Sequence, residues 1–184
     1  MKKESVRAIE KRIERKYLPE FVFGGIDGSV TTFAVVSGAI GASLSSAIVI
    51  ILGFANLIAD GFSMAVSDYL SMKSDNEMHH RHRLRFRELK DPRRTALATF
   101  VAFALIGLIP LLPFVLSLFI SSIKPYQFQL SIALTALAFI IVGYFKGEVT
   151  GKHKILSSLE TLAIGAVAAS LSFIVGYLLR GLLN

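Results

Sequence analysis

The sequence predicts an all-α integral membrane protein with five transmembrane helices, and three observations support this fold class. Hydrophobic residues make up 53% of the 184 residues. Charged residues make up only 18%, whereas a soluble domain has about 25%. Charges are absent from the stretches 28–59, 95–123 and 125–145. Because about 20 apolar residues cross a bilayer, these stretches exclude a soluble enzyme and a secreted domain.

The apolar stretches divide into five predicted helices. Their ranges are 19–42, 46–72, 94–120, 126–145 and 157–179. The uncharged run 28–59 is too long for one crossing. Its only break lies between Gly41 and Ser46, which predicts a tight turn there. Pro110 and Pro113 should bend the third helix and free backbone carbonyls that a neighbour must satisfy.

Local features predict how the helices pack and begin. Gly24 and Gly28 form a small-xxx-small pattern in the first helix, and Gly38 and Gly41 continue the small surface. Such residues let helices approach closely, either within one chain or in a dimer. At the start of the fifth helix, Ser157 and Glu160 have the spacing of a capping box. We prefer that role for Glu160 over metal binding.

Basic residues predict the orientation of the chain in the membrane. The N-terminal arm (1–18), the loop 73–94 and the loop between the fourth and fifth helices hold 18 of the 20 lysines and arginines. Only Lys124 and Arg180 fall on the other side. The positive-inside rule therefore places the N-terminus in the cytoplasm and the C-terminus outside. Residues 19–184 form the transmembrane domain.

The arm 1–18 is predicted to be an amphipathic helix at the membrane interface. Val6, Ile9, Ile13 and Tyr17 recur at helical spacing among charged residues. A helix of this kind lies on anionic lipid headgroups, so membrane lipid is an expected partner. Because aromatic residues do not interleave the basic ones, we expect no nucleic-acid partner.

Acidic residues inside the apolar helices are the best candidates for function. A carboxylate at bilayer depth costs a few kcal/mol and usually faces a cavity, a partner or an ion path. At 1.5 Å per residue, Asp27 and Asp60 should lie at similar depths, about 10–15 Å below the surface. Asp60, Met64 and Asp68 are spaced i, i+4, i+8 and form one stripe, while Glu20 lies on the face of Asp27.

This set of side chains predicts a path for a divalent cation. Carboxylates alone suit Mg²⁺, Ca²⁺ or Mn²⁺, and the soft sulfur of Met64 shifts the preference toward a transition metal such as Fe(II). The same carboxylates could load and release protons. For single residues the structural alternatives are a hydrogen bond to a neighbouring helix for Asp27, packing for Met64 and a solvated headgroup position for Asp68.

The loop 73–94 offers a second candidate metal site at the cytoplasmic entry. If the second helix continues into it, Asp75, His79 and His82 share one face, with Glu77 beside them, as a carboxylate–imidazole site requires. Four arginines between 81 and 87 create a positive field that repels a dication. The alternative is a polybasic loop that faces lipid headgroups.

Several motifs resemble those of the vacuolar iron transporter (VIT) family. The segment GIDGSVTTFA (25–34) resembles the first-helix motif of that family, and ADGFSMAVSDYLS (59–71) resembles its second-helix motif. DPRR (91–94) and GLIPLLP (107–113) are similar to the entry and middle of its third helix, and 165–176 is similar to its last helix. The likeness runs in order through residues 19–182.

The resemblance implies a five-helix homodimer that exports Fe(II), and often Mn(II), from the cytosol in exchange for protons. It places the buried metal ligands on Asp27 and Met64 and an entry acid on Glu20. No permanently bound cofactor is implied. Two features depart from the family pattern. Asn56 stands where many members have a Glu, and a long cytoplasmic metal-binding insert is cut to about 20 residues, which makes this a short form.

Other functions stay open at this point. A transporter of another cation or of protons would share the carboxylates without needing Met64, and a non-transporting membrane scaffold would need neither. An enzyme is not expected, because the helices contain no Ser/His/Asp set and no His-rich zinc motif. The chain has no Cys, which removes thiolate sites. The missing Cys and targeting signal favour a prokaryotic cell membrane over a vacuolar one.

Overall fold

The computed structural model describes the backbone of residues 2–81 and 90–183, and the side chains of residues 16–78 and 90–182. Its helical elements in chain order are α1 (Lys2–Gly41), α2 (Ser46–Arg81), α3 (Pro92–Gly107), η1 (Ile109–Leu111), α4 (Leu112–Leu116), η2 (Ser121–Tyr126), α5 (Gln127–Thr150) and α6 (Lys154–Leu183). Over the described residues, five segments are long and apolar enough to cross a membrane. The predicted fold class is confirmed.

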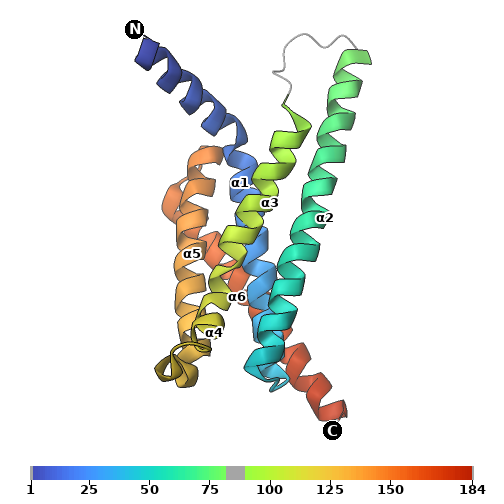
Figure 1. The fold of residues 1–184 in the computed structure, drawn as a ribbon, viewed down its shortest axis with the longest axis vertical. Coiled ribbons are helices and arrows are strands. Elements are labelled where there is room, and N and C mark those ends of the chain that lie inside the picture. The colour runs from blue at the N-terminus through green and yellow to red at the C-terminus, as the bar shows by residue number, and fades with distance from the viewer. Residues whose placement is uncertain (1, 82–89, 184) are drawn as a thin grey trace.

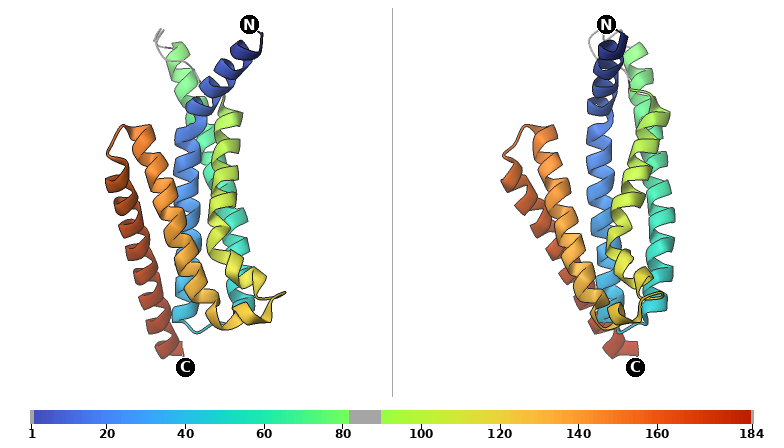
Figure 2. Two further views of the ribbon diagram at one scale, coloured as in Figure 1. Left: turned by 90° about the vertical axis from the view of Figure 1, so that its left-hand side faces the viewer. Right: turned by 60° about the vertical axis from the view of Figure 1, so that its left-hand side comes forward.

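Helix α1 is the centre of the bundle. It contacts α2 and α3 on one side and α5 and α6 on the other (Figure 1). The start of α1, the end of α2 and the connection between α5 and α6 lie at one end of the molecule, and the C-terminus lies at the opposite end (Figure 2). Apart from Lys124, the described basic residues of the loops are therefore gathered at the end of the arm. Which side of a membrane this end faces stays a prediction.

The N-terminal arm and the first span form one helix. We predicted that the span begins at residue 19, but α1 runs without interruption from Lys2 to Gly41 with Pro19 inside it. A proline inside a helix removes one hydrogen bond and bends the axis, and the arm leans away from the bundle (Figure 2). The side chains of residues 2–15 lie outside the described part, so the amphipathic face stays a prediction.

The predicted tight turn between the first two helices is present. Ser43 has a left-handed backbone, with φ of 55°. The amide of Leu44 donates to the carbonyl of Ala39, and that of Ser43 donates to Ile40, both at 2.9 Å. This is the Schellman pattern that ends a helix. After the turn, α2 runs antiparallel to α1 and continues to Arg81, about two and a half turns past the predicted end at residue 72.

The third predicted helix is broken where its prolines lie. It begins at Pro92 rather than at residue 94, because the Asp91 side chain caps it by accepting from the Arg93 amide at 2.9 Å. It then divides into α3, η1 and α4 around Pro110 and Pro113. Ser131 of α5 donates to the Pro110 carbonyl at 2.7 Å. A neighbouring helix therefore donates a hydrogen bond to the backbone within the break.

The capping-box prediction for Glu160 is wrong. Helix α6 begins at Lys154, three residues before the predicted start, so Glu160 lies in its second turn. The carboxylate of Glu160 instead accepts from Lys146 of α5 at 3.0 Å. The preceding helix extends to Thr150 and ends on Gly151, which has φ of 67°. That short left-handed turn allows α6 to start early.

The glycines predicted to allow close packing do so within the chain. A Cβ atom on Gly24 or Gly28 would lie 2.6 Å or 2.4 Å from backbone oxygens of α3. Gly38 and Gly41 press in the same way against Ser172 and Phe173 of α6. The small surface of α1 is thus occupied by α3 and α6, so it is not free to form a dimer interface.

Candidate functional site

Two carboxylates, one on α1 and one on α2, lie near each other inside the apolar spans. Asp27 and Asp60 are both half-buried and close enough for mutual electrostatic repulsion. The tight turn makes the two helices antiparallel, which brings residues 27 and 60 to similar levels. Within the described residues, neither carboxylate has a hydrogen-bond or ion-pair partner. The Thr31 hydroxyl donates to the backbone carbonyl of Asp27 at 2.8 Å, which leaves the carboxylate free.

The thioether of Met64 lies one helical turn beyond Asp60. Met64 is half-buried and packs against a hydrophobic cluster that includes Leu57 and Phe103. Its side chain is therefore held on the core-facing side of α2 rather than turned toward lipid. An ion that reaches the two carboxylates can also reach a soft, uncharged ligand on the same helix.

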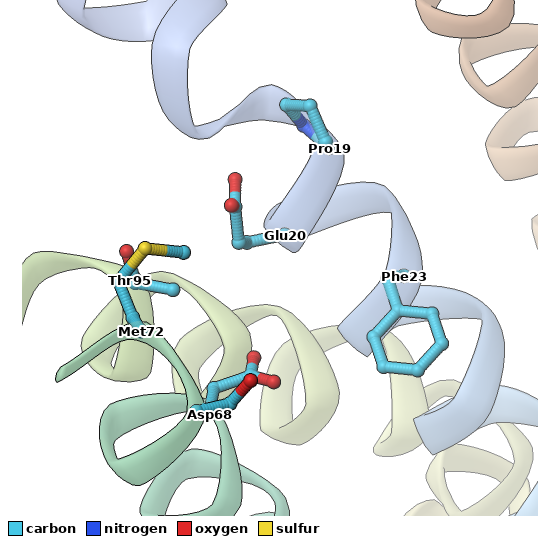
Figure 3. A pocket seen from close by; sticks show the side chains of 7 residues that line it. Pro19, Glu20, Phe23, Asp68, Met72 and Thr95 are labelled. Atoms are coloured by element: carbon cyan, nitrogen blue, oxygen red, sulfur yellow. The ribbon is translucent and has the colours of Figure 1, made fainter. Parts of the chain in front are cut away.

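A second group of acids lies at the N-terminal end of the bundle. Glu20 of α1 and Asp68 of α2 line one cavity of about 240 Å³. Met72 of α2 lines it as well, one turn beyond Asp68, with Pro19, Phe23, Ser71 and Thr95 completing the wall. Figure 3 shows the Glu20 carboxylate entering from α1 and the Asp68 and Met72 side chains entering from α2. Two carboxylates and a thioether thus line this cavity, which we call the mouth.

Glu20 is held at the mouth by a lysine that follows the loop. The Lys90 ammonium donates to Glu20 Oε1 at 2.5 Å, and only 12% of the Glu20 side chain is exposed. The other carboxylate oxygen, Oε2, is fully buried and has no partner among the described residues. Burying a charged oxygen without a hydrogen bond is costly. Glu20 therefore keeps one oxygen ready for a further cation.

Asp68 is positioned from the third helix. The Thr99 hydroxyl, itself buried, donates a short hydrogen bond to Asp68 Oδ2. That bond fixes the rotamer of Asp68 and leaves its other oxygen available to the cavity. Whether Asp68 lies at headgroup level stays a prediction.

The predicted cytoplasmic entry site lies only partly in the described structure. Helix α2 extends to Arg81, so Asp75 and His79 are on one continuous helix, as the prediction required. Asp75 is half-buried and Glu77 is exposed, 4.0 Å from Lys73. The His79 side chain and all of His82 are outside the described residues. Whether this set binds metal stays a prediction.

Three neighbouring residues were missed by the sequence analysis. Met72 continues the four-residue spacing of Met64 and Asp68, and that signal could have revealed it. Thr99 and Lys90 gave no such signal, because their contacts depend on how distant helices meet. Across the described residues, no three His, Asp or Glu side chains gather closely enough to hold a metal on their own.

The sequence model of the VIT family matches residues 18–91 and 78–177. The chain belongs to the VIT family. The match reaches all five spans, the last one as far as residue 177, and includes both acidic groups of the site. A vacuolar iron transporter of Arabidopsis thaliana is 26% identical over 213 aligned positions, which cover 84% of this chain and 82% of the relative. One from Plasmodium berghei is 24% identical over 229 positions, with 91% and 84% covered.

A vacuolar iron transporter of Tulipa gesneriana is more similar over a shorter stretch. It is 38% identical over 89 residues, 47% of this chain and 34% of the relative. The Plasmodium alignment is longer than the 184-residue chain, so that relative has internal residues that this VIT family member lacks. The chain is thus a short form. The relatives are named as vacuolar proteins, so the expectation of a prokaryotic cell membrane gains no support from them.

Asn56 marks the departure from the family pattern in the structure. It lies on α2 one turn before Asp60 and is half-buried. Its Nδ2 is buried without a partner among the described residues. An amide there can donate a hydrogen bond and offers a neutral oxygen, but it cannot add a negative charge next to Asp60. The acidic row of this VIT family member therefore starts one turn later.

Proposed function

We propose that this chain transports ferrous iron, with Mn(II) as a second substrate, out of the cytosol in exchange for protons. The observation that carries the proposal is the neighbouring pair Asp27 and Asp60, two carboxylates inside apolar spans that have no hydrogen-bond or ion-pair partner among the described residues. Such a pair is costly at bilayer depth unless a cation or protons neutralise it. The relatives named vacuolar iron transporters support iron as the cation.

Each acidic group has its own role in this proposal. Glu20 and Asp68 gather the ion at the mouth, and Asp60 conducts it inward. Asp27 and Met64 bind it within the membrane. The thioether favours Fe(II) over Mg²⁺ or Ca²⁺, which prefer oxygen ligands alone. Weak, exchangeable ligands suit an ion that must leave again on the other side.

Proton binding and release at the same carboxylates supplies the driving force for metal export. When the metal leaves toward the outside, the emptied carboxylates repel each other, and protons relieve that repulsion. The protonated carboxylates then return to face the cytosol, where metal displaces the protons. This alternating exposure couples the outward flow of metal to an opposite flow of protons without a bound cofactor and without a catalytic step, so the chain is a transporter and not an enzyme.

The proposed working unit is a homodimer. One subunit does not gather three acidic or imidazole ligands in its described part, so a second subunit would complete the coordination. The outer surface of α2 exposes large apolar side chains, Ile58 and Phe62 among them. These residues lie beside Asp60 and are available to pack on a second copy. Lipid covers the remaining apolar surface.

A flux assay on purified protein in liposomes tests the proposal. With an inward Fe(II) gradient and an opposing pH gradient, the protein should take up iron and release protons. Asp27→Asn should lower uptake at least about tenfold, since it removes the charge at the membrane site. Asp91→Asn is the matched control, because it makes the same change outside the path and keeps a capping residue.

The outcomes separate the rival functions. Proton movement without iron uptake would indicate a transporter of other cations or of protons, and iron uptake that survives Met64→Leu at full rate would refute the ligand role of Met64. The absence of both iron uptake and proton movement would favour a membrane scaffold, and full iron uptake in Asp27→Asn would refute the membrane site built on Asp27. Crosslinking in the membrane at the α2 surface tests the homodimer separately. A chain that transports iron as a monomer would disprove the shared site.

A further inference from the structure

Lys90 places its positive charge against Glu20, the acid that lies at the mouth. Its ammonium lies 2.5 Å from Glu20 Oε1, and 23% of the Lys90 side chain is exposed. The two residues are 70 positions apart in the chain. A freely moving surface lysine would not be held in contact with Glu20. The pair is therefore a feature of the tertiary fold.

The backbone around Lys90 is fixed by three helices. The side-chain amide of Asn76, on α2, donates to the Lys90 carbonyl at 2.9 Å. The next amide, that of Asp91, donates to the Tyr17 hydroxyl of α1 at 3.3 Å. The Asp91 side chain caps α3. These contacts aim the Lys90 side chain into the mouth before any ion arrives.

We propose that Lys90 is a tethered cation that competes with the transported metal for Glu20 and sets the metal concentration at which transport begins. This inference rests on the proposed function. The ammonium and a metal ion need the same carboxylate, so a metal ion enters only by displacing Lys90. In the resting state the ammonium neutralises a mostly buried acid that would otherwise be left uncompensated.

The same arrangement discriminates between cations. A dication that displaces Lys90 gains both oxygens of Glu20, including the partnerless Oε2, together with the free oxygen of Asp68 and the Met72 sulfur. A monovalent cation exchanges one single charge for another and gains little. Lys90 thus raises the threshold for all cations and excludes monovalent ones most strongly. A lysine that merely anchors the loop would do neither.

The concentration dependence of Fe(II) uptake in liposomes tests this role. Lys90→Gln should lower the half-saturating Fe(II) concentration about threefold to tenfold, the range expected for losing one partly exposed competing charge. Lys146→Gln is the matched control, because Lys146 is also 23% exposed and also pairs with a glutamate. It should leave half-saturation within about twofold of wild type. Lys90→Met, which keeps the apolar stem, should reproduce the shift if Lys90→Gln folds poorly.

Two further variants separate competition from anchoring. Lys90→Arg keeps the charge and should keep the wild-type threshold. In a Glu20→Gln background, Lys90→Gln should produce no additional shift, because the contested carboxylate is gone. Equal shifts for the Lys90 and Lys146 variants would mean that only overall charge matters and would overturn the proposal. A loss of maximal uptake with unchanged half-saturation in both Lys90→Gln and Lys90→Met would indicate an anchor and overturn it as well.

A binding measurement makes the result independent of transport. In the detergent-solubilised full chain carrying Asp27→Asn and Met64→Leu, Mn(II) binding followed by electron paramagnetic resonance reports on the mouth. Adding Lys90→Gln should tighten that binding about threefold to tenfold, and adding Glu20→Gln should abolish the gain. If the chain transports no iron but shows this gain, the proposed function fails while the competition stands. If it transports iron and shows no gain, the competition fails alone.

Discussion

Replacing Gly28 by alanine should separate α1 from α3 next to the membrane acids. A Cβ atom at position 28 would lie 2.4 Å from the carbonyl oxygen of Phe103 and 2.9 Å from its Cα. Ordinary contact begins near 3.4 Å, so the helices must move apart by about 1 Å. Both obstructing atoms are backbone, so rotation of a side chain cannot relieve the clash.

Two opposing terms set the size of the effect. Overpacking costs about 1–3 kcal/mol, and a clash with backbone belongs in the upper half of that range. Alanine is also a better helix former than glycine, by about 1 kcal/mol. The net loss for Gly28→Ala is therefore about 1–2 kcal/mol. Gly181→Ala is the matched control, because nothing lies within 4 Å of its Cβ position, and it should gain up to about 1 kcal/mol.

Thermal unfolding in detergent, followed by circular dichroism, measures the difference. The two variants should melt about 5–10 °C apart, with Gly28→Ala the lower. Iron uptake by Gly28→Ala should also fall, because Asp27 moves together with its neighbour. Melting temperatures within a degree of each other would refute the close α1–α3 approach and the placement of Asp27 that depends on it.

Three further substitutions test single hydrogen bonds of the bundle, each read by the same unfolding measurement. Thr99→Ala removes the donor that orients Asp68 and should cost about 1–3 kcal/mol and weaken Mn(II) binding at the mouth, while Thr99→Ser should retain both. Asp91→Ala removes the cap of α3 and should cost about 0.5–2 kcal/mol, and an equal loss in Asp91→Asn would contradict the capping role. Ser131→Ala leaves the Pro110 carbonyl without its donor and should cost about 1 kcal/mol, whereas no change would show that water replaces the hydroxyl.

The five spans could be predicted from the sequence because bilayer thickness imposes one length on every crossing. Charge-free runs identify the spans, and the two prolines identify the break in the third. The ends of helices were less predictable, since capping decides them locally. Asp91 and Pro92 form a clear signal for the start of a helix, which hydropathy alone does not detect. The first helix ran on through Pro19 because nothing before it stops a helix.

For the candidate site too, some features could be predicted from the sequence and others could not. The sequence could identify four candidate site residues, because an acid in an apolar helix is costly and usually functional and because a four-residue spacing relates three of them. They are Asp27, Asp60, Met64 and Asp68. The contact of Lys90 with Glu20 could not, because it joins residues 70 positions apart. Its geometry depends on where the loop returns to the bundle. Local sequence patterns carry no information about the path of a loop back to the bundle.

The spacing along α2 relates the two acidic groups to each other. Asp60 and Asp68 are eight residues apart, about 12 Å along the helix axis, so one ion cannot bind both at once. Met64 lies halfway, about 6 Å from each level. In the proposed path, its uncharged sulfur accepts an ion from the mouth and binds it together with Asp27. Under the proposed function, this row of acid, thioether and acid divides a long transfer into two short steps, and each step ends on a ligand that the ion can leave.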